Sequence, residues 1–164
     1  MSLIGVYTES RARIVEALCG VPGLRIWGPG WEQFLAGREG RDPQAFRGQG
    51  LSPADACKVY NASLVNLNTH HHQSRDAGVN TRAFEILAAG AFELTDHVPG
   101  MEAFLDPGRE VAVYRTSEEA TELARYYAKA DEERRRLAGA GHKRVLAEHT
   151  YRHRMQTLLD AVVR

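Results

Sequence analysis

The stretch GVNTRAFEILAAGAFELTD, residues 78–96, joins a helix pattern directly to a strand pattern. A helix is expected to start at Asn80, and good helix formers follow it as far as Gly90, a residue type that commonly ends helices. The apolar run 92–95 that comes next has the length and residue types of a buried strand. A helix that leads straight into a strand predicts a protein of the α/β class.

The same alternation extends over the rest of the chain. Further strands are predicted at residues 3–7, 24–27, 64–67 and 110–114. Helices are predicted at residues 10–19, 52–61, 101–105 and 117–129, and two more open at Asp131 and Thr150. Because crossovers between parallel strands are right-handed, this order predicts a Rossmann-like, doubly wound, mostly parallel sheet with helices on both faces. The last helices are expected to form a helical C-terminal tail on one side of the sheet.

The composition is that of an ordinary globular domain. The 164 residues are 43% hydrophobic and 26% charged, with a formal net charge of +0, so one domain is expected and nothing favours a nucleic-acid partner. No apolar run approaches the roughly 20 residues that span a bilayer, and the N-terminus lacks the features of a signal peptide. A cytoplasmic location is therefore expected, with Cys19 and Cys57 as buried free thiols.

The start of the helix at Asn80 is the first candidate site. Ligands of open α/β sheets bind beyond the carboxyl ends of the strands, where the helices begin. The first amides of a helix are unpaired and its dipole favours an anion, so a phosphate is expected at this point. The turn that would surround this phosphate consists of Gly78, Val79, Asn80 and Thr81.

Arg82 and Glu85 lie one turn apart on the predicted helix and share one face. The arginine is suited to clamp a phosphate, and the glutamate is suited to accept hydrogen bonds from two ribose hydroxyls. The alternative is an exposed i, i+3 ion pair with no ligand, which contributes little to stability. The face expected to pack on the sheet carries Phe84, Leu87, Ala88 and Ala91.

Three consecutive histidines, His70, His71 and His72, follow the strand predicted at 64–67. Successive side chains do not converge on one metal ion, and no nearby acid or cysteine completes a zinc site, so no metal is expected. One imidazole, assigned to His71, is expected to donate to a phosphate or a sugar hydroxyl. Ordinary loop histidines are the alternative.

Other candidates follow the remaining strands. Arg11 is expected to reach a phosphate from the next loop, with a solvated helix arginine as the alternative. Asp96 is expected to orient donor hydroxyls or a loop, or else to cap a helix. Trp31 is either a stacking platform for a base or a side chain that covers an edge of the core.

Several motifs together resemble one enzyme family. They are GVNTRAFE at 78–85, AAGAF at 88–92 and LTD at 94–96, with GVY at 5–7, WGPGW at 27–31, KVY at 58–60, PGRE at 107–110 and EHTY at 148–151. This combination resembles the C-terminal domain of GT-B glycosyltransferases, the glycosyl transferases group 1, in the variant seen in spore-maturation-type proteins. The match covers nearly the whole chain.

The resemblance implies that residues 1–164 are one domain that binds a nucleoside-diphosphate sugar, without a metal or other cofactor. Glu85 then takes the position of the ribose-binding glutamate, and residues 78–82 lie by the diphosphate. The chain departs from many retaining relatives at Ala77, where they carry a second glutamate; Asp76 stands beside it. Direct contact of a carboxylate with the donor sugar at that point is therefore in doubt.

The resemblance also implies a missing part, because GT-B enzymes need two such domains and this chain has the length of one. The N-terminal, acceptor-binding half is expected to be absent. The last helix carries an apolar stripe that would favour a homodimer in the isolated domain, made of Met155, Leu158, Leu159 and Val162. Two alternatives are a non-catalytic module for binding or assembly and one half of a sugar-nucleotide epimerase.

Overall fold

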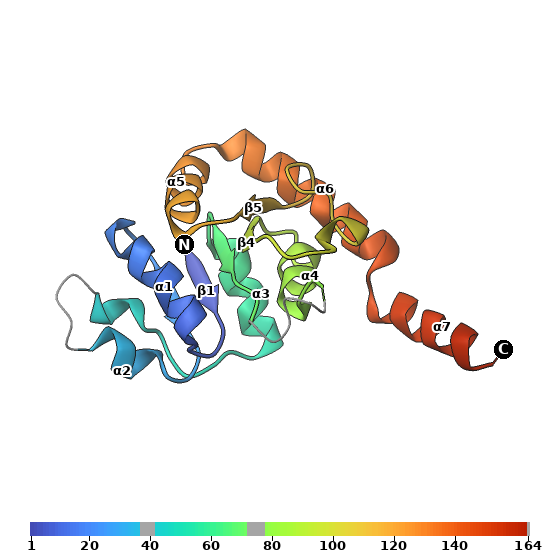
Figure 1. Cartoon of the computed structure of the whole chain (residues 1–164), viewed down its shortest axis with the longest axis horizontal. Helices are drawn as coiled ribbons and strands as arrows, with labels where there is room; N and C mark the ends of the chain where they lie inside the picture. The colour runs from blue at the N-terminus through green and yellow to red at the C-terminus, as the bar shows by residue number, and fades with distance from the viewer. Residues whose placement is uncertain (37–41, 72–77, 164) are drawn as a thin grey trace.

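A parallel β-sheet forms the centre of the computed structural model, which describes residues 1–36, 42–71 and 78–163 (Figure 1). In the described chain its strands have the order β2-β1-β3-β4-β5, and every neighbouring pair is parallel. The strands are β1 Ser2–Ile4, β2 Arg25–Trp27, β3 Asn66–Asn68, β4 Glu93–Asp96 and β5 Ala112–Tyr114. The predicted Rossmann-like, doubly wound sheet is confirmed. The first strand is shorter than the predicted range 3–7.

Helices connect the strands, as predicted. The α-helices are α1 Glu9–Ala17, α2 Trp31–Leu35, α3 Pro53–Ala62, α4 Thr81–Ala88, α5 Ser117–Tyr127, α6 Asp131–Glu148 and α7 Tyr151–Val162. The 3-10 turns are η1 Leu18–Gly20, η2 Pro43–Ala45 and η4 Met101–Ala103. Side-chain caps at Thr8, Ser52, Asn80 and Thr116 explain where four of the helices begin, since each accepts a hydrogen bond from a first-turn amide.

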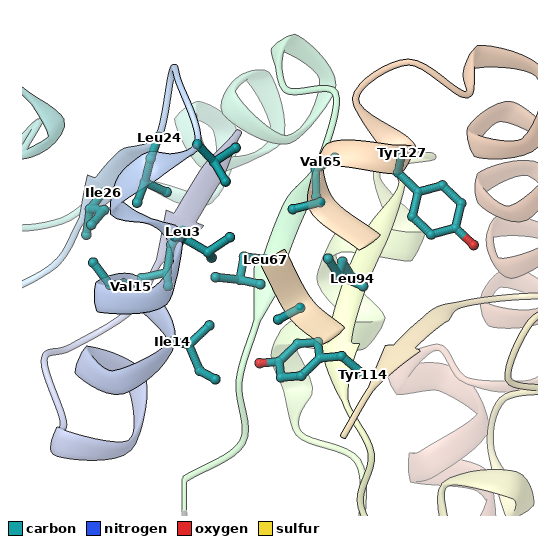
Figure 2. Close-up of a cluster of buried hydrophobic side chains, with 14 of the residues drawn as sticks. Leu3, Ile14, Val15, Leu24, Ile26, Val65, Leu67, Leu94, Tyr114 and Tyr127 are labelled. Atoms are coloured by element: carbon teal, nitrogen blue, oxygen red, sulfur yellow. The ribbon is translucent and has the colours of Figure 1, made fainter. Parts of the chain in front are cut away.

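The two faces of the sheet are covered by different helices. Helices α1 and α5 pack on one face, and α3 and α4 pack on the other. Helix α6 lies against α4 and α5. Figure 2 shows the apolar cluster under α1 and α5, to which the strands contribute Leu3, Leu67, Leu94 and Tyr114. This arrangement confirms the prediction of helices on both faces.

The face covered by α3 and α4 is polar along the two central strands. Asn66 and Asn68 of β3 and Glu93 and Thr95 of β4 are all buried on this side. Alternation along a strand explains this, because residues 66, 68, 93 and 95 point away from the apolar cluster that contains Leu67 and Leu94.

The predicted inner face of α4 was partly wrong. Ala83, Ile86 and Leu87 are buried, as their i, i+3, i+4 spacing explains. Ala88 is exposed, because it lies about 100° around the helix from Leu87. Phe84 is half-buried and packs against Phe104 and His149 instead of the sheet.

The prediction that both cysteine thiols are buried was wrong as well. Cys19 and Cys57 are exposed, and Cys57 lies about 100° around α3 from the buried residue Ala56. Of the two interpretations of Trp31, the core residue is confirmed: its ring is fully buried and its Nε1 donates to the Gly5 carbonyl oxygen at 2.7 Å.

Helix α7 extends away from the rest of the chain (Figure 1). None of its described residues is buried, and its predicted apolar stripe is therefore open to solvent. Within the described ranges, no helix is both long enough and apolar enough to cross a membrane.

Candidate functional site

The strand order places the candidate site between β1 and β3. The chain runs from β1 to β2 on one side and continues with β3 on the other, and ligands of such sheets bind at this switch point. Arg11, on α1, spans the two strand ends: its Nη1 donates to the Val6 carbonyl oxygen at 2.9 Å and its Nη2 to that of Thr69 at 3.2 Å. The arginine predicted to reach a phosphate therefore holds the two loops of the switch point together.

A cleft of about 810 Å³ opens beside this point, between α3, α4 and the loops after β1 and β2. Gly28 forms part of its wall with φ +139°, and a Cβ atom there would lie 2.1 Å from the Gly5 carbonyl oxygen. Only glycine allows the two loops to approach this closely. On the helix side, the cleft is lined by Cys57, Tyr60, Arg82 and Glu85.

Arg82 and Glu85 face this cleft together, as predicted from their spacing. Nη1 of Arg82 donates to Oε2 of Glu85 at 2.8 Å and to the Tyr60 hydroxyl oxygen at 2.7 Å. The i, i+3 ion pair is thus present, but its side chains, 31% and 49% exposed, line a cleft. Burial raises the pKa of Tyr60, so its hydroxyl stays protonated at neutral pH. The sequence analysis had noted Tyr60 only as part of the motif KVY at 58–60 and had assigned it no role in the site.

The first turn of α4 leaves two amides available. The Asn80 side chain accepts a hydrogen bond from the Ala83 amide at 3.1 Å and caps the helix, which confirms that the helix starts here. Among the described residues, no hydrogen bond uses the amides of Thr81 or Arg82. Gly78, with φ +87°, turns the chain before these amides. Val79, the next residue along the chain, is half-buried. First-turn amides point out of the helix end, so these two, which form no hydrogen bond within the described residues, are suited to bind an anion.

Charges of both signs surround this helix end. Burial lowers the pKa of Arg11, and the nearby charge of Arg82 lowers it further, while Asp96 acts in the opposite direction. Arg82 is also paired with Glu85. An anion bound at the helix N-terminus would interact favourably with both guanidinium groups and with the helix dipole.

Of the two described histidines of the 70–72 run, His70 is the buried one, and the sequence alone gave no reason to select it. Its ring is fully buried, with Nδ1 2.7 Å from Oδ1 of Asp96 and Nε2 accepting the Asn80 amide at 3.0 Å. Asp96 is 3% exposed and lies behind His70. His71 is half-buried at the end of the described loop, and the roles predicted for His71 and Asp96 towards a donor stay predictions. His72, Asp76 and Ala77 lie outside the described residues.

A second set of buried polar side chains also leads to Asn80. Asn68 donates to Oδ1 of Asn80 at 3.0 Å and to Oε1 of Glu93 at 2.8 Å, and Asn80 donates back to Asn68 at 3.1 Å. Burial raises the pKa of Glu93 to about 8. A signal for these residues existed in the polar positions of the buried segments NLN at 66–68 and ELTD at 93–96.

Within residues 1–36, 42–71 and 78–163, no group of three or more histidine, cysteine, aspartate or glutamate side chains is placed to hold a metal ion.

These features define a Rossmann-like α/β domain with its candidate site at the switch point of a parallel sheet. A solved structure with the same fold is a sucrose-phosphate synthase from Thermosynechococcus elongatus, with a TM-score of 0.70 over 99% of this chain and 45% of that chain, at 13% sequence identity. At this identity the likeness concerns the fold alone.

The chain belongs to the glycosyl transferase-like family, which it matches over residues 11–160. It is also similar to the spore protein CgeB of Bacillus subtilis (strain 168), with 25% identity over 161 residues, 91% of this chain and 49% of that protein. The chain therefore spans about half the length of these relatives. The resemblance to the C-terminal domain of GT-B glycosyltransferases is confirmed.

Proposed function

We propose that this domain binds the nucleoside-diphosphate sugar donor of a glycosyltransferase. The observation that carries the proposal is a cleft that presents the Arg82 and Glu85 side chains, on a helix whose first-turn amides of Thr81 and Arg82 form no hydrogen bond within the described residues. The N-terminal end of the helix dipole and the guanidinium groups of Arg11 and Arg82 favour a diphosphate. Family membership favours the donor over other anions.

Each group has a distinct role in this proposal. The diphosphate lies at the turn 78–81 and accepts hydrogen bonds from the first-turn amides and the Arg82 guanidinium. Glu85 gives up its hydrogen bond with Arg82 and accepts hydrogen bonds from the two ribose hydroxyls. The base occupies the part of the cleft next to Gly28 and Leu51.

The chemistry follows from the charge that develops during transfer. When the sugar leaves the donor, negative charge grows on the β-phosphate of the departing nucleoside diphosphate. Preorganised amides and a guanidinium stabilise this charge, and each such donor contributes on the order of a few kcal/mol. In the proposed mechanism these groups act without a metal ion.

The acceptor belongs to a second domain in this proposal. The support is the length of the relatives, of which this chain covers about half. The exposed apolar stripe of α7 is a candidate contact for that second domain, and in the isolated chain it would favour a homodimer. The isolated chain is accordingly expected to bind donor and to transfer nothing.

Calorimetric titration with UDP, GDP and their hexose conjugates tests the proposal. At least one nucleotide is expected to bind saturably, and Arg82→Ala or Glu85→Ala is expected to weaken that binding about tenfold or more, as for hydrogen bonds to charged groups. Arg109→Ala is the matched control, because Arg109 also forms an i, i+3 pair, with Asp106, but is 80% exposed on another surface.

The same titration also tests the alternative of a non-catalytic module. The relative from Bacillus subtilis is named a spore protein, and that name states no reaction. A wild-type chain that binds none of these nucleotides would favour a non-catalytic module for binding or assembly.

A further inference from the structure

His70 links the first turn of α4 to strand β4. Its Nε2 accepts a hydrogen bond from the Asn80 amide at 3.0 Å. An amide nitrogen only donates, so Nε2 carries no proton and the neutral ring holds its proton on Nδ1. That proton is donated to Oδ1 of Asp96 at 2.7 Å, and the same oxygen accepts the backbone amide of His70 at 2.8 Å.

The Asn80 amide is a group that the helix itself leaves unsatisfied. In a capping box, a glutamate or glutamine at the third helical position accepts the amide of the N-cap residue. Here Asn80 is the N-cap and the third helical residue is Ala83, which has no side-chain acceptor. His70, from the end of β3, supplies the missing acceptor across the fold.

This arrangement fixes the orientation of the turn from inside the protein. With its own amide bound to His70 and its side chain paired to Asn68, Asn80 has little freedom to rotate. The next two amides, of Thr81 and Arg82, are the ones that remain available for a ligand. Catalytic sites depend on such supporting contacts, because an anion seat must be held in place before the ligand arrives.

We propose that His70 is a positioning residue that holds the anion-binding turn of α4 for the donor diphosphate. The inference rests on the function proposed above. It assigns to His70 a role that differs from that predicted for His71, since His70 is fully buried and acts through Asn80.

Three variants separate positioning from general stability. His70→Phe keeps a ring of similar size and removes both hydrogen bonds. His70→Gln restores an acceptor for the Asn80 amide and a donor for Asp96. Tyr114→Phe is the control. It removes a buried hydroxyl that is bonded at 2.8 Å to Thr69 and at 3.0 Å to the Asn68 carbonyl oxygen, and that has no bond to the Asn80 amide.

The first measurement is UDP and GDP binding by calorimetry, with thermal unfolding of each variant. His70→Phe is expected to weaken nucleotide binding about tenfold, the cost of an unsatisfied buried amide and a displaced turn. His70→Gln is expected to recover most of this loss. Tyr114→Phe is expected to lower the unfolding temperature and to leave nucleotide affinity unchanged. Equal affinity in His70→Phe and wild type, or an equal loss in Tyr114→Phe, would overturn the proposal.

The second measurement is hydrogen exchange of the Asn80 amide by NMR without any nucleotide. The amide is expected to be protected in wild type and in His70→Gln and to exchange much faster in His70→Phe. Fast exchange in wild type would contradict the inference even if His70→Phe does not fold. Absence of nucleotide binding in wild type, with normal Asn80 protection, would overturn the proposed function and leave the contact between His70 and Asn80 established.

Discussion

The two faces of the central sheet differ in what they contribute. On the α1 and α5 side, Leu3, Leu67, Leu94 and Tyr114 belong to one apolar cluster (Figure 2). On the α3 and α4 side, the same strands present buried polar groups, namely Ser2, Asn66, Asn68, Glu93 and Thr95. The same strands are therefore apolar on one face of the sheet and partly polar on the other.

Buried polar side chains are costly unless they are hydrogen-bonded, so the second face needs a different explanation from the first. Asn66 donates to the carbonyl oxygens of Tyr60 at 3.1 Å and Phe92 at 2.9 Å, and so holds the end of α3. Asn68 holds Asn80 and thereby the start of α4. Both walls of the cleft are thus attached to polar residues of this face, which orient the site in addition to filling the interior.

The largest effect is expected on the apolar face. Leu94→Ala removes a fully buried side chain and is expected to lower the free energy of unfolding by about 3–5 kcal/mol, from lost burial and the cavity left behind. Nucleotide affinity of the folded fraction should stay within about twofold of wild type, which is a small free-energy difference. Chemical denaturation and calorimetry give the two values, and a large loss of affinity would break the comparison.

A pH-dependent effect is expected on the polar face. The pKa of Glu93 is raised from 4.5 to about 8 by burial, so the folded state holds a proton that the unfolded state has already released. Between these two values stability falls as pH rises, and the full penalty is present above about pH 8. Glu93→Gln keeps an amide in place of the neutral acid and is expected to be more stable than wild type at pH 9, by roughly 1–3 kcal/mol.

Denaturation of wild type and Glu93→Gln across this pH range measures the difference. The stability curve of the variant should be flatter between pH 5 and about pH 9 than that of wild type. Parallel curves would mean that Glu93 is ionised in the folded protein.

Substitution of Asn68 is expected to change stability less than the two substitutions above. It is expected to change nucleotide affinity more than Leu94→Ala does. Asn68→Ala removes the bonds to Asn80 and Glu93 and is expected to cost about 1–2 kcal/mol of unfolding free energy. It should also weaken UDP or GDP binding about tenfold, since α4 loses an anchor. If Asn68→Ala is as destabilised as Leu94→Ala and binds nucleotide normally, Asn68 contributes to stability and does not orient the site.

Much of the fold was predictable from local patterns. The strand and helix order, the start of the helix at Asn80 and the shared face of Arg82 and Glu85 depend on residues close in sequence. These features follow from turn chemistry and helical periodicity, which a single sequence carries.

The support of the site was not predictable in the same way. Which of three consecutive histidines turns inward depends on the path of the loop after β3, and only the position of Asp96 on the neighbouring strand selects His70. Cys57 was predicted to be buried because its surroundings in the sequence are partly apolar, but the helix turns it to solvent. Contacts between distant segments decide these cases.

The most direct test of the central claim is a titration of the ¹⁵N-labelled wild-type chain with UDP and GDP, followed by NMR. The claim predicts that the largest amide shifts for the nucleotide that binds occur at Thr81 and Arg82, with smaller ones at Glu85 and Tyr60 and none at Arg109. Shifts confined to other parts of the chain, or no shifts with either nucleotide, would contradict it.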